Sequence, residues 1–148
     1  MRNVKRIQRR KAALVGVVAS LLTATASATA PVGRYTAATD TVRDNRTGLT
    51  WRSAPLTATF SRSQASTECG RIGSGWRLPT IAELQSIVDI TRTSPAVDTT
   101  AFPSTPSAFF WSSSPMLKDT SLGWGVDFSN GSTTFKATTE AARVRCVR

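Results

Sequence analysis

The two cysteines of this chain, Cys69 and Cys146, restrict its fold more than any other feature. In an oxidising compartment, an even pair of cysteines at this distance favours one disulfide. A metal site lacks partners, because the 148 residues contain no His and no Cys-x-x-Cys motif. The remaining alternative is a pair of free thiols. We expect the disulfide, whose loop of 77 residues would stabilise the folded state by about 4.5 kcal/mol on chain-entropy grounds.

The first 28 residues are typical of a secretory signal peptide. A basic segment that ends at Lys11 precedes an apolar run from Ala12 to Ala26, and Ala26-Ser27-Ala28 is typical of a cleavage site. We place the cleavage after Ala28. The alternative is an uncleaved membrane anchor, but the apolar run is shorter than the roughly 20 residues of a confident span. We therefore expect export to the periplasm or the cell surface, and no stable membrane span after cleavage.

Removal of the leader changes the charge of the chain. The whole sequence carries +10, but six of its 19 Lys and Arg residues lie in the leader, so 13 basic residues remain against nine acidic ones, a net charge of +4. This mild charge permits attraction to acidic polysaccharides or membrane surfaces. It does not resemble the basic stripe of a nucleic-acid-binding protein, and we expect no nucleic-acid partner.

Length and composition predict one folded domain after the leader. The chain is too short for two ordinary domains, and a hydrophobic content of 40% is compatible with a packed core. Residues 29–40 are small and polar and contain Pro31 and Gly33, which is typical of a flexible lead-in. We expect the domain to cover residues 41–148.

A capping box predicts the first helix. Ser61 suits the N-cap, and Gln64 follows three residues later, so a helix is expected over about 62–69. Gly70 is typical of a helix end. The helix is short and only weakly apolar, so we expect its attachment to the domain to depend on Cys69.

A second capping box lies in the stretch WRLPT, residues 76–80. Thr80 and Glu83 form the box, and a helical apolar stripe follows at Ile81, Leu84, Ile87 and Val88. The preceding Trp76 and Arg77 have two interpretations. They are either a platform that stacks on a ligand and pairs with its acidic group, or a clamp in which Trp76 is core and Arg77 bonds backbone carbonyls or a carboxylate. The adjacent capping signals favour the clamp.

The remaining pattern predicts strands and loops. Short hairpins are expected over 42–51 and, around the Asn130-Gly131 turn, over 124–135, with strands over 109–112 and 142–147 and loops over 91–108 and 113–122. In the last strand, Val144 and Cys146 share one face, and Arg143 and Arg145 share the other. This alternation predicts a buried cysteine beside exposed arginines.

These signals, in this order, resemble the Lcl C-terminal domain family, a bacterial domain family of unknown function. The matching stretches are Val42 to Trp51 (V-x-D-x-x-T-G-L-x-W), Ala65 to Cys69 (A-x-x-x-C), Trp76 to Leu84 (W-R-L-P-T-x-x-E-L), Trp111 to Ser114 (W-S-S-S), Trp124 to Gly131 (W-x-V-x-F-x-x-G) and Val144 to Val147 (V-R-C-V). They cover about residues 40–148, nearly all of the mature chain.

The resemblance implies an α+β, C-type-lectin-like fold, in which two helices pack on a small, twisted, mostly antiparallel sheet. It also implies a disulfide from the first helix to the last strand, the pairing already expected from the cysteines. The namesake adhesin of the family is associated with sulfated polysaccharides, which suggests a binding role. Its collagen-like repeats are absent from this chain, so multivalent attachment is not expected by analogy.

The inventory of reactive groups argues against catalysis. The sequence has no His, both cysteines are assigned to the bridge, and the carboxylates Asp98, Asp119, Asp127 and Glu140 are scattered. The calcium-binding triplets Glu-Pro-Asn, Gln-Pro-Asp and Trp-Asn-Asp of sugar-binding lectins are also absent. We therefore expect no enzyme activity, no metal and no cofactor.

Five residues are the candidates for ligand binding: Arg92, Lys118, Trp124, Arg143 and Arg145. Trp51 and Trp111 lie in strand-like alternations and are expected in the core, whereas Trp124 borders a loop and is the most exposed candidate. Arg143 and Arg145, with the loop residues Arg92 and Lys118, are candidates for a basic patch, although an exposed, solvated face is the favoured interpretation of these charges.

We therefore expect an exported, non-catalytic binding module. Its ligand surface would be the loop region 91–124, and its partner an acidic polysaccharide or a protein of the envelope or cell surface. The alternative is a structural or assembly component of the cell envelope that binds no small ligand.

Overall fold

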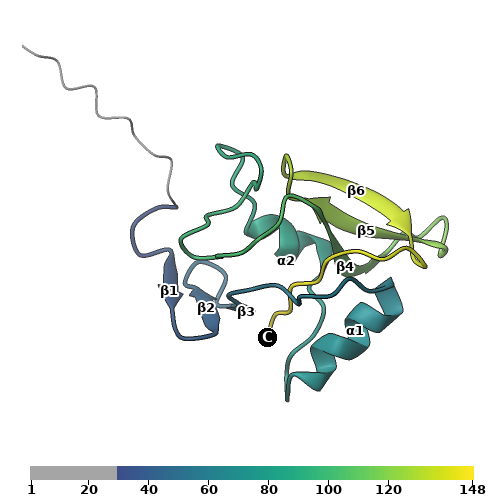
Figure 1. The fold of residues 1–148 in the computed structure, drawn as a ribbon, viewed down its shortest axis with the longest axis horizontal. Helices are drawn as coiled ribbons and strands as arrows, with labels where there is room; N and C mark the ends of the chain where they lie inside the picture. The colour runs from purple at the N-terminus through teal and green to yellow at the C-terminus, as the bar shows by residue number, and fades with distance from the viewer. Residues whose placement is uncertain (1–29) are drawn as a thin grey trace, which may run out of the picture.

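The computed structural model describes residues 30–148, so the expected signal peptide at 1–28 lies outside the described residues. The order of elements is β1 (Tyr35–Ala37), β2 (Thr41–Asp44), β3 (Thr50–Arg52), α1 (Arg62–Arg71), α2 (Ile81–Ser86), β4 (Phe109–Pro115), β5 (Leu122–Asp127) and β6 (Ser132–Ala137). Figure 1 shows β1–β3 at one end of the domain and β4–β6 at the other. The described chain thus contains two helices and two antiparallel three-stranded sheets rather than the one small sheet that we expected.

The first sheet includes a strand that the sequence did not predict. β1 lies inside the segment expected to be a flexible lead-in, and it pairs with β2 so that Tyr35 is opposite Asp44. The Tyr35 ring packs edge-on against the buried Phe102, with ring centroids 5.1 Å apart. Only three residues long, β1 has no alternating apolar pattern of its own, and distant contacts hold it in place.

The second sheet contains the predicted hairpin. β5 and β6 pair from Leu122–Ala137 to Asp127–Ser132. At the turn, the Gly131 amide donates to the carbonyl oxygen of Asp127 at 2.7 Å. Gly131 has a φ of +80°, a conformation that glycine adopts without a steric penalty. The Asn-Gly signal therefore placed this turn correctly.

Both capping boxes are present. The hydroxyl oxygens of Ser61 and Thr80 accept from the N3 backbone amides, and the side chains of Gln64 and Glu83 accept from the N-cap amides. The first helix continues past the expected end at Gly70 and finishes at Arg71. Apart from the helix itself, nothing lies within 4 Å of the position that a Cβ would take at Gly70, so this position in the helix has open space around it.

The disulfide joins α1 to the end of the domain, as expected. Cys69 and Cys146 are bonded and fully buried, and their Cα atoms are 5.5 Å apart. They belong to one of two core clusters, which also contains Ala65, Trp76, Leu78, Phe109, Trp111, Ala142 and Val144. The other cluster lies between the first sheet, α2 and β4–β5, and it includes Val42, Trp51, Leu84, Ile87, Val97, Phe102, Phe110, Val126 and Phe128.

The closing segment, residues 142–148, is not the regular strand that we expected. It makes isolated bridges with several parts of the chain instead, including Trp51, Phe60 and Arg77. Its backbone also bonds β4, where the Trp111 amide donates to the Arg143 carbonyl oxygen at 3.0 Å. The segment therefore connects the two sheets and is covered on more than one side.

Candidate ligand-binding site

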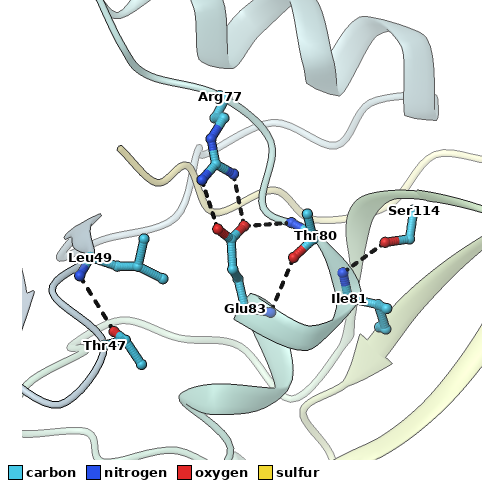
Figure 2. Close-up of polar contacts among 7 residues, drawn as sticks. All are labelled: Thr47, Leu49, Arg77, Thr80, Ile81, Glu83 and Ser114. Atoms are coloured by element: carbon cyan, nitrogen blue, oxygen red, sulfur yellow. Dashed lines mark hydrogen bonds and ion pairs between the residues drawn. The ribbon is translucent and has the colours of Figure 1, made fainter.

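The WRLPT stretch forms a structural clamp at the start of α2. Trp76 is 9% exposed, and the guanidinium of Arg148 lies 4.9 Å from its ring centroid. Figure 2 shows Arg77 facing Glu83, with Nη1–Oε2 and Nη2–Oε1 distances of 2.7 Å. The same carboxylate accepts from the Thr80 amide at 2.8 Å. These contacts agree with the clamp interpretation.

The clamp perturbs the charges of both partners. Bonding to Arg77 holds the pKa of Glu83 at about 2, well below its ordinary value of 4.5. Bonding to Glu83 in turn raises the pKa of Arg77. Both groups are charged at neutral pH and already paired with each other. A ligand would therefore have to compete with this ion pair to bind either side chain.

The start of α2 is also fixed to the end of β4. The Ser113 amide donates to the Pro79 carbonyl oxygen at 2.7 Å. The Ile81 amide donates to the Ser114 hydroxyl at 3.0 Å, as Figure 2 shows. These bonds hold the last residues of β4 beside the start of α2. Two cavities border this segment.

The first is the Trp124 groove, an open apolar cavity of about 460 Å³. Its lining residues are Ile81, Ser114, Pro115, Met116, Leu117, Lys118 and Trp124. Trp124 is half-buried, and its ring packs edge-on against Phe135, with centroids 5.8 Å apart. Leu117 is 92% exposed and Phe135 is 48% exposed. Apolar side chains with one cation at the margin are the usual composition of a small-ligand site.

The structure brings together only two of the five candidate residues. Lys118 and Trp124 line the same groove. Arg92 pairs with Asp89 at 3.2 Å. Arg143 donates to the Thr57 carbonyl oxygen at 2.7 Å and lines a different cavity.

Comparison with known proteins identifies the family of this chain. The sequence model of the Lcl C-terminal domain matches residues 40–148, most of the chain. The chain belongs to the Lcl C-terminal domain family. A comparison with curated proteins finds no match.

In this Lcl C-terminal domain, Arg145 does not contribute to a basic patch and is not on an exposed face, contrary to our expectation of an exposed arginine. It is fully buried, and its guanidinium donates to the carbonyl oxygens of Arg52 and Ser53 and to the Thr105 hydroxyl. Its Cζ lies 5.0 Å from the ring centroid of Phe102. The strand-like alternation failed because the closing segment is covered on both of its faces.

Burial lowers the pKa of Arg145 to about 9, so the group is still protonated at neutral pH. Within residues 30–148 no carboxylate lies within ion-pair distance of it. Carbonyl oxygens and an aromatic face surround the cation instead. Arg145 therefore holds the 52–53 segment and the 102–105 loop together.

A second cavity of this Lcl C-terminal domain was missed by sequence reasoning. It lies at the start of α1, measures about 360 Å³, and is lined by Ser61, Arg62, Ser63, Ser66, Leu78, Ser113, Thr120, Thr138 and Thr139. The three serines among the six residues 61–66, around Arg62, were the available local signal. The threonines come from distant segments, so no local pattern could have grouped them.

The described residues offer no metal centre or membrane helix. In the 30–148 range, no group of three or more His, Cys, Asp and Glu side chains is arranged to hold a metal ion. In the same range, no helix is long and apolar enough to cross a membrane. The buried disulfide is typical of proteins that fold in an oxidising compartment.

Proposed function

We propose that this protein is an exported, non-catalytic binding module that recognises acidic glycans through the Trp124 groove. The observation that carries the proposal is the placement of Trp124 and Lys118 on one open cavity. An aromatic face packs well against the C–H face of a sugar ring, and a lysine attracts an acidic substituent. The groove lies at the end of the 91–124 region that we expected to bind the ligand.

The proposal includes the cellular setting and the wider fold class. Export is supported by the basic and apolar leader and by the disulfide. A C-type-lectin-like fold is supported by family membership and by the joining of α1 to the closing segment. On this proposal, the protein acts in the periplasm or at the cell surface.

A glycan array of the exported protein at two salt concentrations tests the function. We expect binding to acidic glycans that weakens as salt increases, because exposed charges are screened. Trp124→Ala should abolish binding, and Lys118→Gln should weaken it. Arg43→Gln is the matched control, since it removes the same charge from an exposed position on β2. Equal binding by the wild type and the three variants would reject the Trp124 groove as the ligand-binding site.

One observation favours a second candidate function. The groove wall formed by Met116 and Leu117 is apolar, and Leu117 is almost fully exposed. A structural or assembly role would place an envelope protein against this wall. A flat glycan array, together with co-purification of one envelope protein that is lost in Leu117→Asp, would support this second function over the first.

A further inference from the structure

Arg62, the first residue of α1, is a cation without an acidic partner in the described chain. Its Nε donates to the Ser112 carbonyl oxygen at 3.1 Å, and its Nη2 donates to that of Ser113. No carboxylate of residues 30–148 lies within ion-pair distance, and Nη1 has no acceptor there. Burial lowers the pKa of the Arg62 guanidinium. The cation is thus partly desolvated, with one nitrogen left for a ligand.

The position of Arg62 is fixed before any ligand arrives. A Cβ at Gly123 would lie 2.5 Å from Cδ of Arg62 and 3.1 Å from the Trp111 ring. The arginine stem therefore lies directly over a glycine, and the two carbonyl bonds orient its guanidinium. A group held in one orientation loses less freedom when it binds a ligand.

The cavity around Arg62 is lined by hydroxyl groups. Seven of its nine lining residues are Ser or Thr, and none is acidic. Each hydroxyl has a proton to donate and rotates to direct it. Several hydroxyl donors and one guanidinium suit a group with several acceptor oxygens. Leu78 supplies the apolar part of the wall.

The Arg62 cavity and the Trp124 groove are lined by neighbouring residues of one chain segment. Ser113 and Thr120 line the cavity, whereas residues 114–118, which lie between them in the chain, line the groove. One short segment thus separates an apolar aromatic surface from a cationic, hydroxyl-rich one. A ligand that crosses this segment would contact both.

We propose that the Arg62 cavity binds an oxyanion, the sulfate, phosphate or carboxylate substituent of a sugar. As the anionic subsite of the glycan ligand, it rests on the function proposed above. Arg62 and the hydroxyl groups bind the charged substituent, and Trp124 packs on the sugar ring of a neighbouring unit. Lys118 then attracts the polymer from the other side of the segment.

Ser66→Glu tests the cavity and leaves both carbonyl bonds of Arg62 in place. Ser66 lies four residues after Arg62 on α1, so a glutamate there supplies the missing counter-ion and preserves the helix. Thr67→Glu is the matched control. It adds the same charge at the next residue, which is exposed and does not line the cavity.

The probes are glucose 6-sulfate, glucose 6-phosphate, glucuronic acid and glucose, titrated into the exported protein and followed by NMR. We expect saturable shifts at Arg62 with at least one acidic sugar, and none with glucose. The three acidic sugars differ only in their substituent, so they distinguish the sources of the oxyanion. Ser66→Glu should weaken binding at least tenfold, whereas Thr67→Glu should change it less than twofold.

Two results would overturn the proposal that the Arg62 cavity binds an oxyanion. One is the absence of shifts at Arg62 with all three acidic sugars, and the other is equal affinity in Ser66→Glu and Thr67→Glu. If acidic polymers still bind and Trp124→Ala abolishes that binding, only the Arg62 inference fails. If no polymer binds but acidic sugars saturate the cavity, the proposed function fails and the oxyanion site remains.

Discussion

The Arg77 guanidinium and the Glu83 carboxylate lie in register across the start of α2, joined by two N–O contacts of 2.7 Å. Glu83 also completes the capping box with Thr80. A single carboxylate therefore fixes both the extended residues before the helix and the first turn of the helix. This double use explains how a helix of six residues is held without a long apolar face.

The pair predicts a pH dependence of stability. The folded-state pKa of Glu83, about 2, lies below its ordinary 4.5, so its stabilising contribution is fully present above pH 4.5 and is lost as pH falls towards 2. Because the pair is partly solvated, we expect about 1 kcal/mol. Urea unfolding of wild type and Glu83→Gln should differ by this amount at pH 6 and converge near pH 2. A constant difference across that range would contradict the assignment.

The disulfide predicts a redox-dependent stability. Cys69→Ala should lower the free energy of unfolding by about 4 kcal/mol under oxidising conditions, because it removes a cross-link over 77 residues. In reductant, wild type and variant should melt at similar temperatures. Mass mapping of the purified protein supplies the control, since it measures directly whether the two sulfurs are bonded.

Arg145 predicts a large effect from a residue that looks like surface in the sequence. Arg145→Met should destabilise by about 3 kcal/mol or more, because it leaves buried carbonyl oxygens without donors. Arg143→Met is the matched control at a half-buried position two residues earlier, and it should cost about 1 kcal/mol. Thermal unfolding measures the stability of both variants. Similar losses of stability would contradict the prediction that the burial of Arg145 makes its substitution more costly.

Two glycines predict opposite outcomes for the same substitution. A Cβ at Gly125 would lie 2.2 Å from the Phe110 carbonyl oxygen and 2.3 Å from the Phe109 ring, so Gly125→Ala must displace β4. We expect a loss of about 2 kcal/mol or more. Gly70→Ala, in α1 with open space around it, should stabilise by about 0.5–1 kcal/mol. Denaturant midpoints of the two variants should therefore move in opposite directions.

Local chemistry made much of this fold predictable. Both capping boxes, the Asn130-Gly131 turn and the pairing of Cys69 with Cys146 depend on nearby residues or on a choice among few partners. The burial of Trp51 and Trp111 followed from strand-like alternation. For the caps and the turn, the sequence signal and the structural cause lie within a few residues of each other, whereas the two cysteines, 77 residues apart, allow only one pairing.

What could not be predicted depends on segments far apart in the chain. β1 exists because Tyr35 meets Phe102, and Arg145 is buried because residues 52–53 and 105 surround it. The candidate site likewise has one part that the sequence predicted and one part that it did not. Trp124 was singled out as an exposed aromatic, but the Arg62 cavity is assembled from five separate stretches of the chain and has no local pattern.

The closing segment has a consequence for biosynthesis. Residues 142–148 bond residues 50–60, Arg77 and β4, so they join parts of the chain that are made much earlier. A ribosome makes these seven residues after every segment that they bond. Until they are made, the hydrogen bonds that this segment forms with both ends of the domain are absent and Cys69 has no partner. The domain should therefore complete its fold only after residues 142–148 have been made.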